Sequence, residues 1–199
     1  LLMTILSLAP SILIMTTSYL RLIIVFHFLK TALGTQSMPP SQLLAGIALF
    51  ITFFIMAPTF NKINDEALQP LMNGQMKVEE AMDKGIQPLR EFMLNNVRDE
   101  DIALFVEMAA LEMPDSRLEL PTYILLPAFS ISELRAGFII GFFIFIPFLM
   151  VDMIIASILL SMGMMMIPPM MISLPFKILL FILIDGWSLI IGSVIRSFG

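Results

Sequence analysis

The 199-residue chain contains no cysteine, a single histidine and few charged residues for its length. Without cysteine it cannot form a disulfide, a thiolate metal site or a cysteine nucleophile. The lone His27 lies in an apolar run and cannot build a metal site by itself. Charged residues make up 14% of the chain, against about 25% in a typical soluble domain. These scarcities argue against a metalloenzyme and against an ordinary soluble domain.

The sequence also lacks the patterns that usually carry catalysis. It has no HExxH zinc motif, no nucleophile elbow and no phosphate-binding glycine loop that ends in lysine. An intramembrane aspartyl protease would need a pair of catalytic aspartates. Asp152 and Asp185 are the only acids in the apolar regions, so this one class of enzyme stays open as an alternative. We therefore predict that the chain is not an enzyme and has no catalytic residue, no metal site and no cofactor.

Hydrophobic residues are abundant: they form 58% of the chain, and its mean hydropathy is +0.95. They gather in four apolar stretches, at residues 1–29, 43–58, 136–160 and 172–195. The third would give about 37 Å of helix at 1.5 Å per residue, enough to cross a ~30 Å hydrocarbon core. The second is only marginally long for a span, and Pro10 interrupts the first. We expect a membrane-associated chain in which some stretches pack as broken or re-entrant hairpins.

A polar segment, residues 59–135, separates the second and third apolar stretches. It holds fourteen of the sixteen acidic residues and seven of the eleven basic ones, a net charge of −7. An acidic surface argues against nucleic-acid binding, because the phosphate backbone attracts basic proteins. The charge distribution favours a non-cytoplasmic, periplasmic location for this segment.

Local patterns in the polar segment predict helices. Apolar residues between positions 78 and 93 recur at helical spacing, although Gly85 and Pro88 are expected to break that run into two pieces. The acids at 99–101 should lie on the first turn of a second helix, at residues 102–113, where the helix dipole favours them. Ser130 and Glu133 match a capping box that would open the third apolar stretch.

No run of alternating β-branched residues is present, so we predict an all-α chain. It should consist of N-terminal hydrophobic helices at 1–58, a polar acidic helical segment at 59–135, and a C-terminal hydrophobic helical hairpin at 136–199.

Charged side chains inside the apolar stretches need an explanation, because each costs ~2.5–3.5 kcal/mol at the centre of an inserted helix. If the last two stretches form a hairpin that turns at 164–165, Asp152 and Lys177 lie at equal depth, and so do Glu133 and Arg196. Asp185 is eight residues from Lys177, ~12 Å along a straight helix, too far for a direct bond. Two roles stay open for these charges: buried pairing that sets the register of the hairpin, or a relay for protons or ions.

Two further patterns concern packing and contact. Gly137 and Gly141 form a small-xxx-small pattern, which allows helices to approach closely.

Six of the eighteen methionines fall within residues 162–171, between the last two apolar stretches. The proline pair at 168–169 prevents a regular helix from continuing through them. Because methionine side chains are flexible and polarizable, we interpret this loop as a contact surface for changing partners.

Several of these segments together resemble the FliP family, called SctR in injectisomes. The resemblance covers essentially the whole chain. Its motifs are LGTQ at 33–36, FFIMAP at 53–58, QPLREF at 87–92, LPAFSISEL at 126–134, GFFIFIPFL at 141–149, GMMMIPP at 163–169, LPFK at 174–177 and DGW at 185–187. The family's cleavable signal peptide does not appear in this sequence, and an upstream segment of that kind is an open expectation.

The resemblance implies a function that the composition alone does not. It implies a core subunit of the type III (flagellar) protein export gate, in the bacterial inner membrane and the flagellar basal body. Further copies of the chain, five in all, would assemble with FliQ-like and FliR-like subunits and other export apparatus proteins into a multi-subunit channel for unfolded substrates. The resemblance further implies that Met164, Met165 and Met166 form a pore gasket, with Gly163, Pro168 and Pro169 shaping the loop.

One alternative of another class stays open at this point: an ion-coupled transporter of small solutes that uses Asp152, Lys177 and Asp185. A transporter should act alone or as a simple homo-oligomer, whereas a gate subunit should co-purify with other small membrane proteins. The choice between flagellum and injectisome also stays open.

Overall fold

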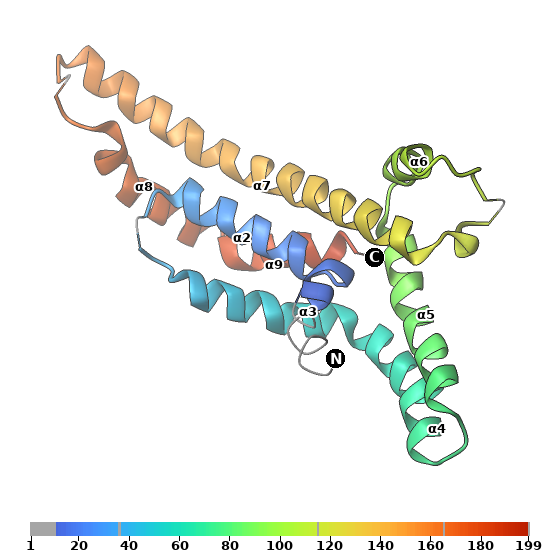
Figure 1. Cartoon of the computed structure of the whole chain (residues 1–199). Coiled ribbons are helices and arrows are strands. Elements are labelled where there is room, and N and C mark those ends of the chain that lie inside the picture. Colours follow the sequence, from blue (N-terminus) through green and yellow to red (C-terminus); the bar gives the residue numbers. More distant parts are fainter. Residues whose placement is uncertain (1–10, 36, 115, 165, 199) are drawn as a thin grey trace. The chain divides into compact units, whose positions relative to one another are not determined.

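The computed structural model describes residues 11–35, 37–114, 116–164 and 166–198, and every regular element within those ranges is helical (Figure 1). The predicted all-α fold is therefore confirmed. The α-helices that carry labels in Figure 1 are α2 (Tyr19–Leu33), α3 (Ser41–Ile63), α4 (Gln69–Met72), α5 (Val78–Asn96), α6 (Asp99–Met108), α7 (Thr122–Ser161), α8 (Pro169–Leu183) and α9 (Gly186–Arg196). A π-helical turn, Asn64–Leu68, joins α3 to α4, and a short 3-10 helix, Arg117–Glu119, precedes α7.

The described residues form two compact units that interleave along the sequence. The described residues of the first unit come from 11–20 and 48–135, and those of the second from 21–47 and 136–198. The second unit thus combines the end of the first apolar stretch with the C-terminal hairpin, which a linear division of the sequence into three parts does not anticipate.

Among the residues that the structure describes, two helical segments are long and apolar enough to cross a membrane: Ser41–Met72 and Thr122–Ser161. The pair α8 and α9 would count as a third if it forms one span, and it is bent by 63° between the two helices. The segment that contains the second apolar stretch is longer than predicted, because the helix continues beyond Pro58 into polar residues. Once a helix has started, each added residue gains a hydrogen bond, so the helix need not end where its apolar pattern ends.

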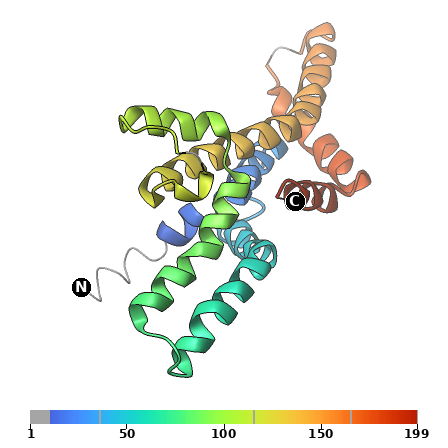
Figure 2. The same cartoon turned by 90° about the vertical axis from the view of Figure 1, so that its right-hand side faces the viewer.

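The first unit has its own apolar core, which α5, α6 and the beginning of α7 share. Its fully or almost fully buried members are Met93, Leu94, Val97, Ile102, Val106, Leu120, Ile124, Leu125, Ala128 and Phe129. The guanidinium of Arg90, itself buried, donates hydrogen bonds to the carbonyl oxygens of Leu118 (2.9 Å) and Leu120 (2.6 Å) and to the hydroxyl of Thr122. This side chain therefore ties the segment before α7 to α5. Figure 2 shows α4 and α5 side by side as a helical hairpin.

The expected break of the helical run at Gly85 and Pro88 is wrong: α5 runs without interruption from Val78 to Asn96. A proline inside a helix costs about 3 kcal/mol or more, because it removes one hydrogen bond and clashes with the preceding turn. Pro88 is buried together with Ala81 and Met93 on the same helix. We conclude that this packing outweighs the local cost, as tertiary contacts commonly stabilise helices more than propensity does.

The predicted capping box at Ser130 is also wrong, because α7 already begins at Thr122. The hydroxyl of Ser130 donates to the carbonyl oxygen of Leu126 (2.9 Å), one turn earlier in the same helix. A capping residue must have a non-helical backbone, whereas the residues before Ser130 are helical because Leu125 and Phe129 pack in the core. Helix α6 likewise begins earlier and ends earlier than predicted, at Asp99 and Met108, with its acids on the first turn as expected.

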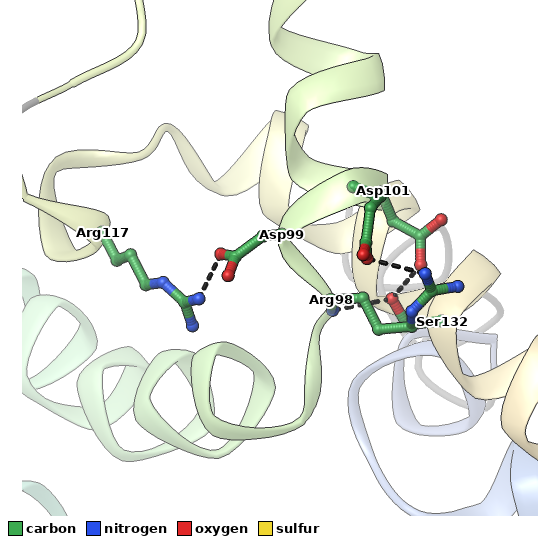
Figure 3. Close-up of polar contacts among 6 residues, drawn as sticks. Arg98, Asp99, Asp101, Arg117 and Ser132 are labelled. Atoms are coloured by element: carbon green, nitrogen blue, oxygen red, sulfur yellow. Dashed lines mark hydrogen bonds and ion pairs between the residues drawn. The ribbon is translucent and has the colours of Figure 1, made fainter.

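Ser132, two residues after Ser130 on α7, anchors the beginning of α6. Figure 3 shows its hydroxyl between two groups at the start of α6: it accepts from the backbone N–H of the N-cap residue Arg98 (3.1 Å) and donates to the carboxylate of Asp101 (2.6 Å). The same view shows the ion pair between Asp99 and Arg117. A free N–H at the helix start is thus satisfied by a side chain from another helix.

Candidate functional site

The methionine loop, residues 162–168, connects α7 to α8. Its first turn is a Schellman motif: the N–H of Gly163 donates to the carbonyl oxygen of Leu160 (3.1 Å), and that of Met164 donates to Leu159 (3.0 Å). Gly163 has a φ of +74°, a conformation that glycine adopts without steric cost and other residues rarely adopt. Gly163 thus takes the left-handed position at the end of α7, where the methionine loop begins.

Two prolines form the other end of the loop. Pro168 is the N-cap residue of α8, with extended backbone angles, and Pro169 is the first residue of the helix. Proline suits this position, because its fixed φ is helical and its missing N–H would have no partner in the first turn. The loop is therefore bounded by a glycine turn on one side and a rigid proline pair on the other.

The methionine side chains of the loop that the structure describes are exposed. The exposed fraction is 41% for Met164 and 96% for Met166, and Met170 and Met171 at the start of α8 are exposed as well. Met165, the third predicted gasket residue, lies outside the described residues. A single chain thus presents uncharged, flexible thioether side chains that are available to contact other molecules.

A buried ion pair joins the two helices next to this loop. The ammonium of Lys177, on α8, lies 2.6 Å from a carboxylate oxygen of Asp152, on α7, and the Lys177 residue is only 3% exposed. The Lys177 ammonium also donates to the carbonyl oxygen of Ala32 (3.1 Å), near the end of α2. The other carboxylate oxygen of Asp152 accepts a hydrogen bond from the hydroxyl of Ser173 (2.5 Å). We call these residues (Asp152, Ser173, Lys177 and the Ala32 carbonyl) the polar clamp, since they connect three helices.

Two members of the polar clamp were not expected from the sequence. Ser173 precedes Lys177 by four residues, so both lie on one face of α8, a spacing that could have suggested a shared partner. Nothing in the sequence indicates the Ala32 carbonyl. It becomes available because α2 ends there, where Gly34 has a φ of +72° and lies close to the Lys177 ammonium.

The other charged candidates have different surroundings. Glu133 is completely buried in the first unit. Asp185 lies at the bend between α8 and α9 with a φ of +49°, is exposed and makes no capping hydrogen bond. The next residue, Gly186, lies so close to Phe181 that a Cβ atom on it would come within 2.2 Å of the ring. The structure therefore brings Asp152 and Lys177 together, while Asp185 marks the bend.

Gly137 and Gly141 lie where α7 packs against α2. A Cβ at Gly137 would lie 3.0 Å from Ile24, and one at Gly141 would lie 2.5 Å from the ring of Phe28. The rings of Phe28 and Phe138 meet edge to face, with their centroids 5.4 Å apart. The close approach that the small-residue pattern suggests occurs within the chain, between these two helices.

Within the part of the chain that the structure describes, no three His, Cys, Asp or Glu side chains are arranged to hold a metal ion. The exposed methionine loop and the polar clamp beside it form the candidate site, an arrangement suited to contact and positioning.

Comparison with known proteins matches this chain to one family. Residues 2–194 match the model of the FliP family. The chain is 56% identical to the flagellar biosynthetic protein FliP of Bacillus subtilis over 198 residues, which cover 100% of this chain and 90% of the relative. It is 50% identical to that of Caulobacter vibrioides (99% of this chain, 74% of the relative) and 48% identical to that of Pectobacterium carotovorum (99% and 76%).

Proposed function

The chain belongs to the FliP family, a structural membrane component of the flagellar export apparatus, and from this premise we propose that it forms and seals the export channel. It associates with other export apparatus proteins and is not an enzyme. In the proposed assembly, five copies of the chain together with FliQ-like and FliR-like subunits surround a channel for unfolded substrates. The methionine loops of these copies form a ring that closes the channel when it is empty.

The exposed methionine loop is the observation that carries this proposal. A ring of loops, each held between Gly163 and the Pro168–Pro169 pair, would present thioethers that make no fixed hydrogen bonds. Such a collar can exclude water and ions, and it can also mould itself to a passing chain of any sequence. The polar clamp supports the same role, because it holds both ends of the loop through α7 and α8.

Leakage of small solutes through the idle complex tests the seal. Deletion of Met164, Met165 and Met166 should leave assembly intact and make cells that express the complex permeable to ions or small solutes. Replacement of the three by leucine keeps the apolar character and loses flexibility, so its defect should be milder. Replacement of Met108 by serine serves as a control, because this methionine is similarly exposed (73%) on α6 and lies outside the loop. A deletion variant as tight as the wild type would refute the gasket.

The alternative of an ion-coupled transporter receives less support from the geometry. Lys177 and Asp152 are already paired and hydrogen-bonded within the polar clamp, and Asp185 lies exposed at the bend. A Lys177→Ala variant that assembles normally and loses transport would favour the transporter.

We further propose that residues 59–135 lie on the periplasmic side of the inner membrane, in the flagellar basal body. The net charge of −7 in this segment supports this orientation. Because the chain has no cysteine, single cysteines at the exposed positions Asn73 and Asn95 would report it directly. They should react with thiol reagents that cannot cross the inner membrane; reaction only with reagents that enter the cytoplasm would reverse the orientation.

A further inference from the structure

A small cavity with a basic rim lies in the second unit, apart from the methionine loop. Its volume is about 160 Å³, and six residues of α2 and α3 line it: Ile23, Phe26, His27, Lys30, Ser41 and Leu44. Phe26 and Leu44 are buried and form an apolar floor. The ammonium of Lys30 donates to the hydroxyl of Ser41 (2.9 Å), and His27 is exposed beside it.

The charge of this cavity is positive and has no acidic counterpart among its lining residues. The sequence contains no aspartate or glutamate before Asp65, whereas Arg21, His27 and Lys30 all precede it. Two of the three hydrogens on the Lys30 ammonium remain for other acceptors, and a histidine ring carries at least one N–H donor. An apolar floor strengthens the attraction of an anion, because the local dielectric is lower than that of water. The rim therefore suits an anionic group with several acceptor oxygens.

The position of the cavity narrows the choice of anion. Ser41 is the first residue of α3 and of the candidate span Ser41–Met72, and Lys30 lies in the last turn of α2. Charged groups at the ends of apolar helices lie at the depth of lipid headgroups, and basic pockets between such helices bind anionic headgroups. The volume equals that of about five water molecules at ~30 Å³ each, so a phosphate group fits.

We propose that His27, Lys30 and Ser41 form a binding site for a phosphate group, supplied by the headgroup of an anionic phospholipid. In this site Lys30 and His27 donate to the phosphate oxygens, Ser41 helps to orient the Lys30 ammonium, and the acyl chains lie along the apolar surfaces of the helices.

Native mass spectrometry tests this site on the full-length chain, extracted from membranes with the subunits that remain bound to it and exchanged into micelles that contain phosphatidylglycerol. Lys30→Gln should need about tenfold more lipid for the same occupancy, which corresponds to about 1.4 kcal/mol. Lys30→Arg keeps the charge and should retain the lipid. Lys62→Gln is the matched control, since it removes one positive charge from an exposed position far along the sequence and should leave occupancy unchanged.

A second arm distinguishes the source of the phosphate. In this experiment inorganic phosphate is added to the wild type and to Lys30→Gln. If the variant binds phosphate more weakly than the wild type while both bind the lipid equally, the site takes a soluble phosphate group instead of a lipid headgroup. His27→Gln guards against a folding defect, because the side chain is exposed and its replacement should weaken binding without affecting assembly. If lipid and phosphate bind equally to the wild type, Lys30→Gln and His27→Gln, the proposal is wrong, and Lys30 serves only to join α2 to α3.

Discussion

The helices of the polar segment and the C-terminal hairpin bury apolar residues to very different degrees. In the first unit, α5, α6 and the start of α7 enclose a core of their own, with Phe129 completely buried. In the long helix α7, only 11% of the most apolar stretch of 18 residues is buried. Aromatic side chains such as those of Phe142 and Phe143 are exposed. Large exposed apolar surfaces indicate contact with lipid or other proteins. The first region is thus stabilised by its own packing, whereas the second depends on surroundings that the single chain does not contain.

The largest expected effects come from a pair of phenylalanine variants that test this difference. Phe129→Ala should destabilise the chain by ~3–5 kcal/mol, because it leaves a cavity in a closed core. Phe143→Ala removes a ring that is 66% exposed, so the fold of the single chain should hardly change while the yield of assembled complex falls. Thermal unfolding in detergent and native gel electrophoresis would measure the two effects. Equal loss of stability in both variants would contradict the comparison.

A second pair of variants compares a buried ion pair of the hairpin with an exposed one of the polar region. Lys177→Ala leaves Asp152 without its ammonium partner in a mostly buried setting, and such a loss typically costs ~3–5 kcal/mol. Lys62 forms an ion pair of similar length with Glu91 (2.8 Å), but both side chains are about half exposed. Lys62→Ala should therefore cause no measurable loss, since solvent already screens the pair. Resistance of the complex to rising detergent concentration provides the readout, and similar sensitivity in both variants would argue against a structural role for the clamp.

Two glycine variants test how closely α7 packs against α2 within the chain. Gly141→Ala would place a methyl group 2.5 Å from the ring of Phe28, and such overpacking costs ~1–3 kcal/mol. Gly46→Ala is the control: apart from its chain neighbours and the nearby backbone of its own helix, no atom lies within 4 Å of the new methyl group, so it should stabilise α3 by about 0.4–1 kcal/mol. Melting temperatures should thus move in opposite directions. A shift of both in the same direction would show that the contact between α2 and α7 differs from the one described.

The smallest effect concerns acid stability at the start of α6. The backbone N–H at the helix start and the neighbouring Arg98 lower the pKa of Glu100 below its ordinary value of 4.5. A lowered pKa stabilises the folded chain at neutral pH, and this contribution disappears as the pH falls below 4.5 and through the lowered value. Glu100→Gln should therefore reduce the pH dependence of unfolding slightly between neutral and acidic pH. Because Glu100 is exposed, an unchanged pH profile would mean that solvent screens the whole effect.

The local pattern of residues in the sequence was sufficient to predict several features of this molecule. The apolar stretches predicted helices of membrane type, and Gly163 with the proline pair predicted where the last hairpin turns. Equal depth in that hairpin predicted that Asp152 and Lys177 face each other, and their charged groups lie 2.6 Å apart. These features depend on residue type and on spacing along one or two helices, both of which can be read directly from the order of residues.

Tertiary packing decided the features that local pattern predicted wrongly or did not indicate. Helix α5 continues through Pro88, and α7 begins at Thr122 instead of at the capping signal of Ser130. Ser132 satisfies the start of a different helix, and the Ala32 carbonyl completes the polar clamp. The contacts of Ser132 and of the Ala32 carbonyl join residues far apart in sequence, and local pattern cannot indicate them. The continuation of α5 and the early start of α7 go with burial of apolar side chains, which contributes more free energy than capping or helix propensity does.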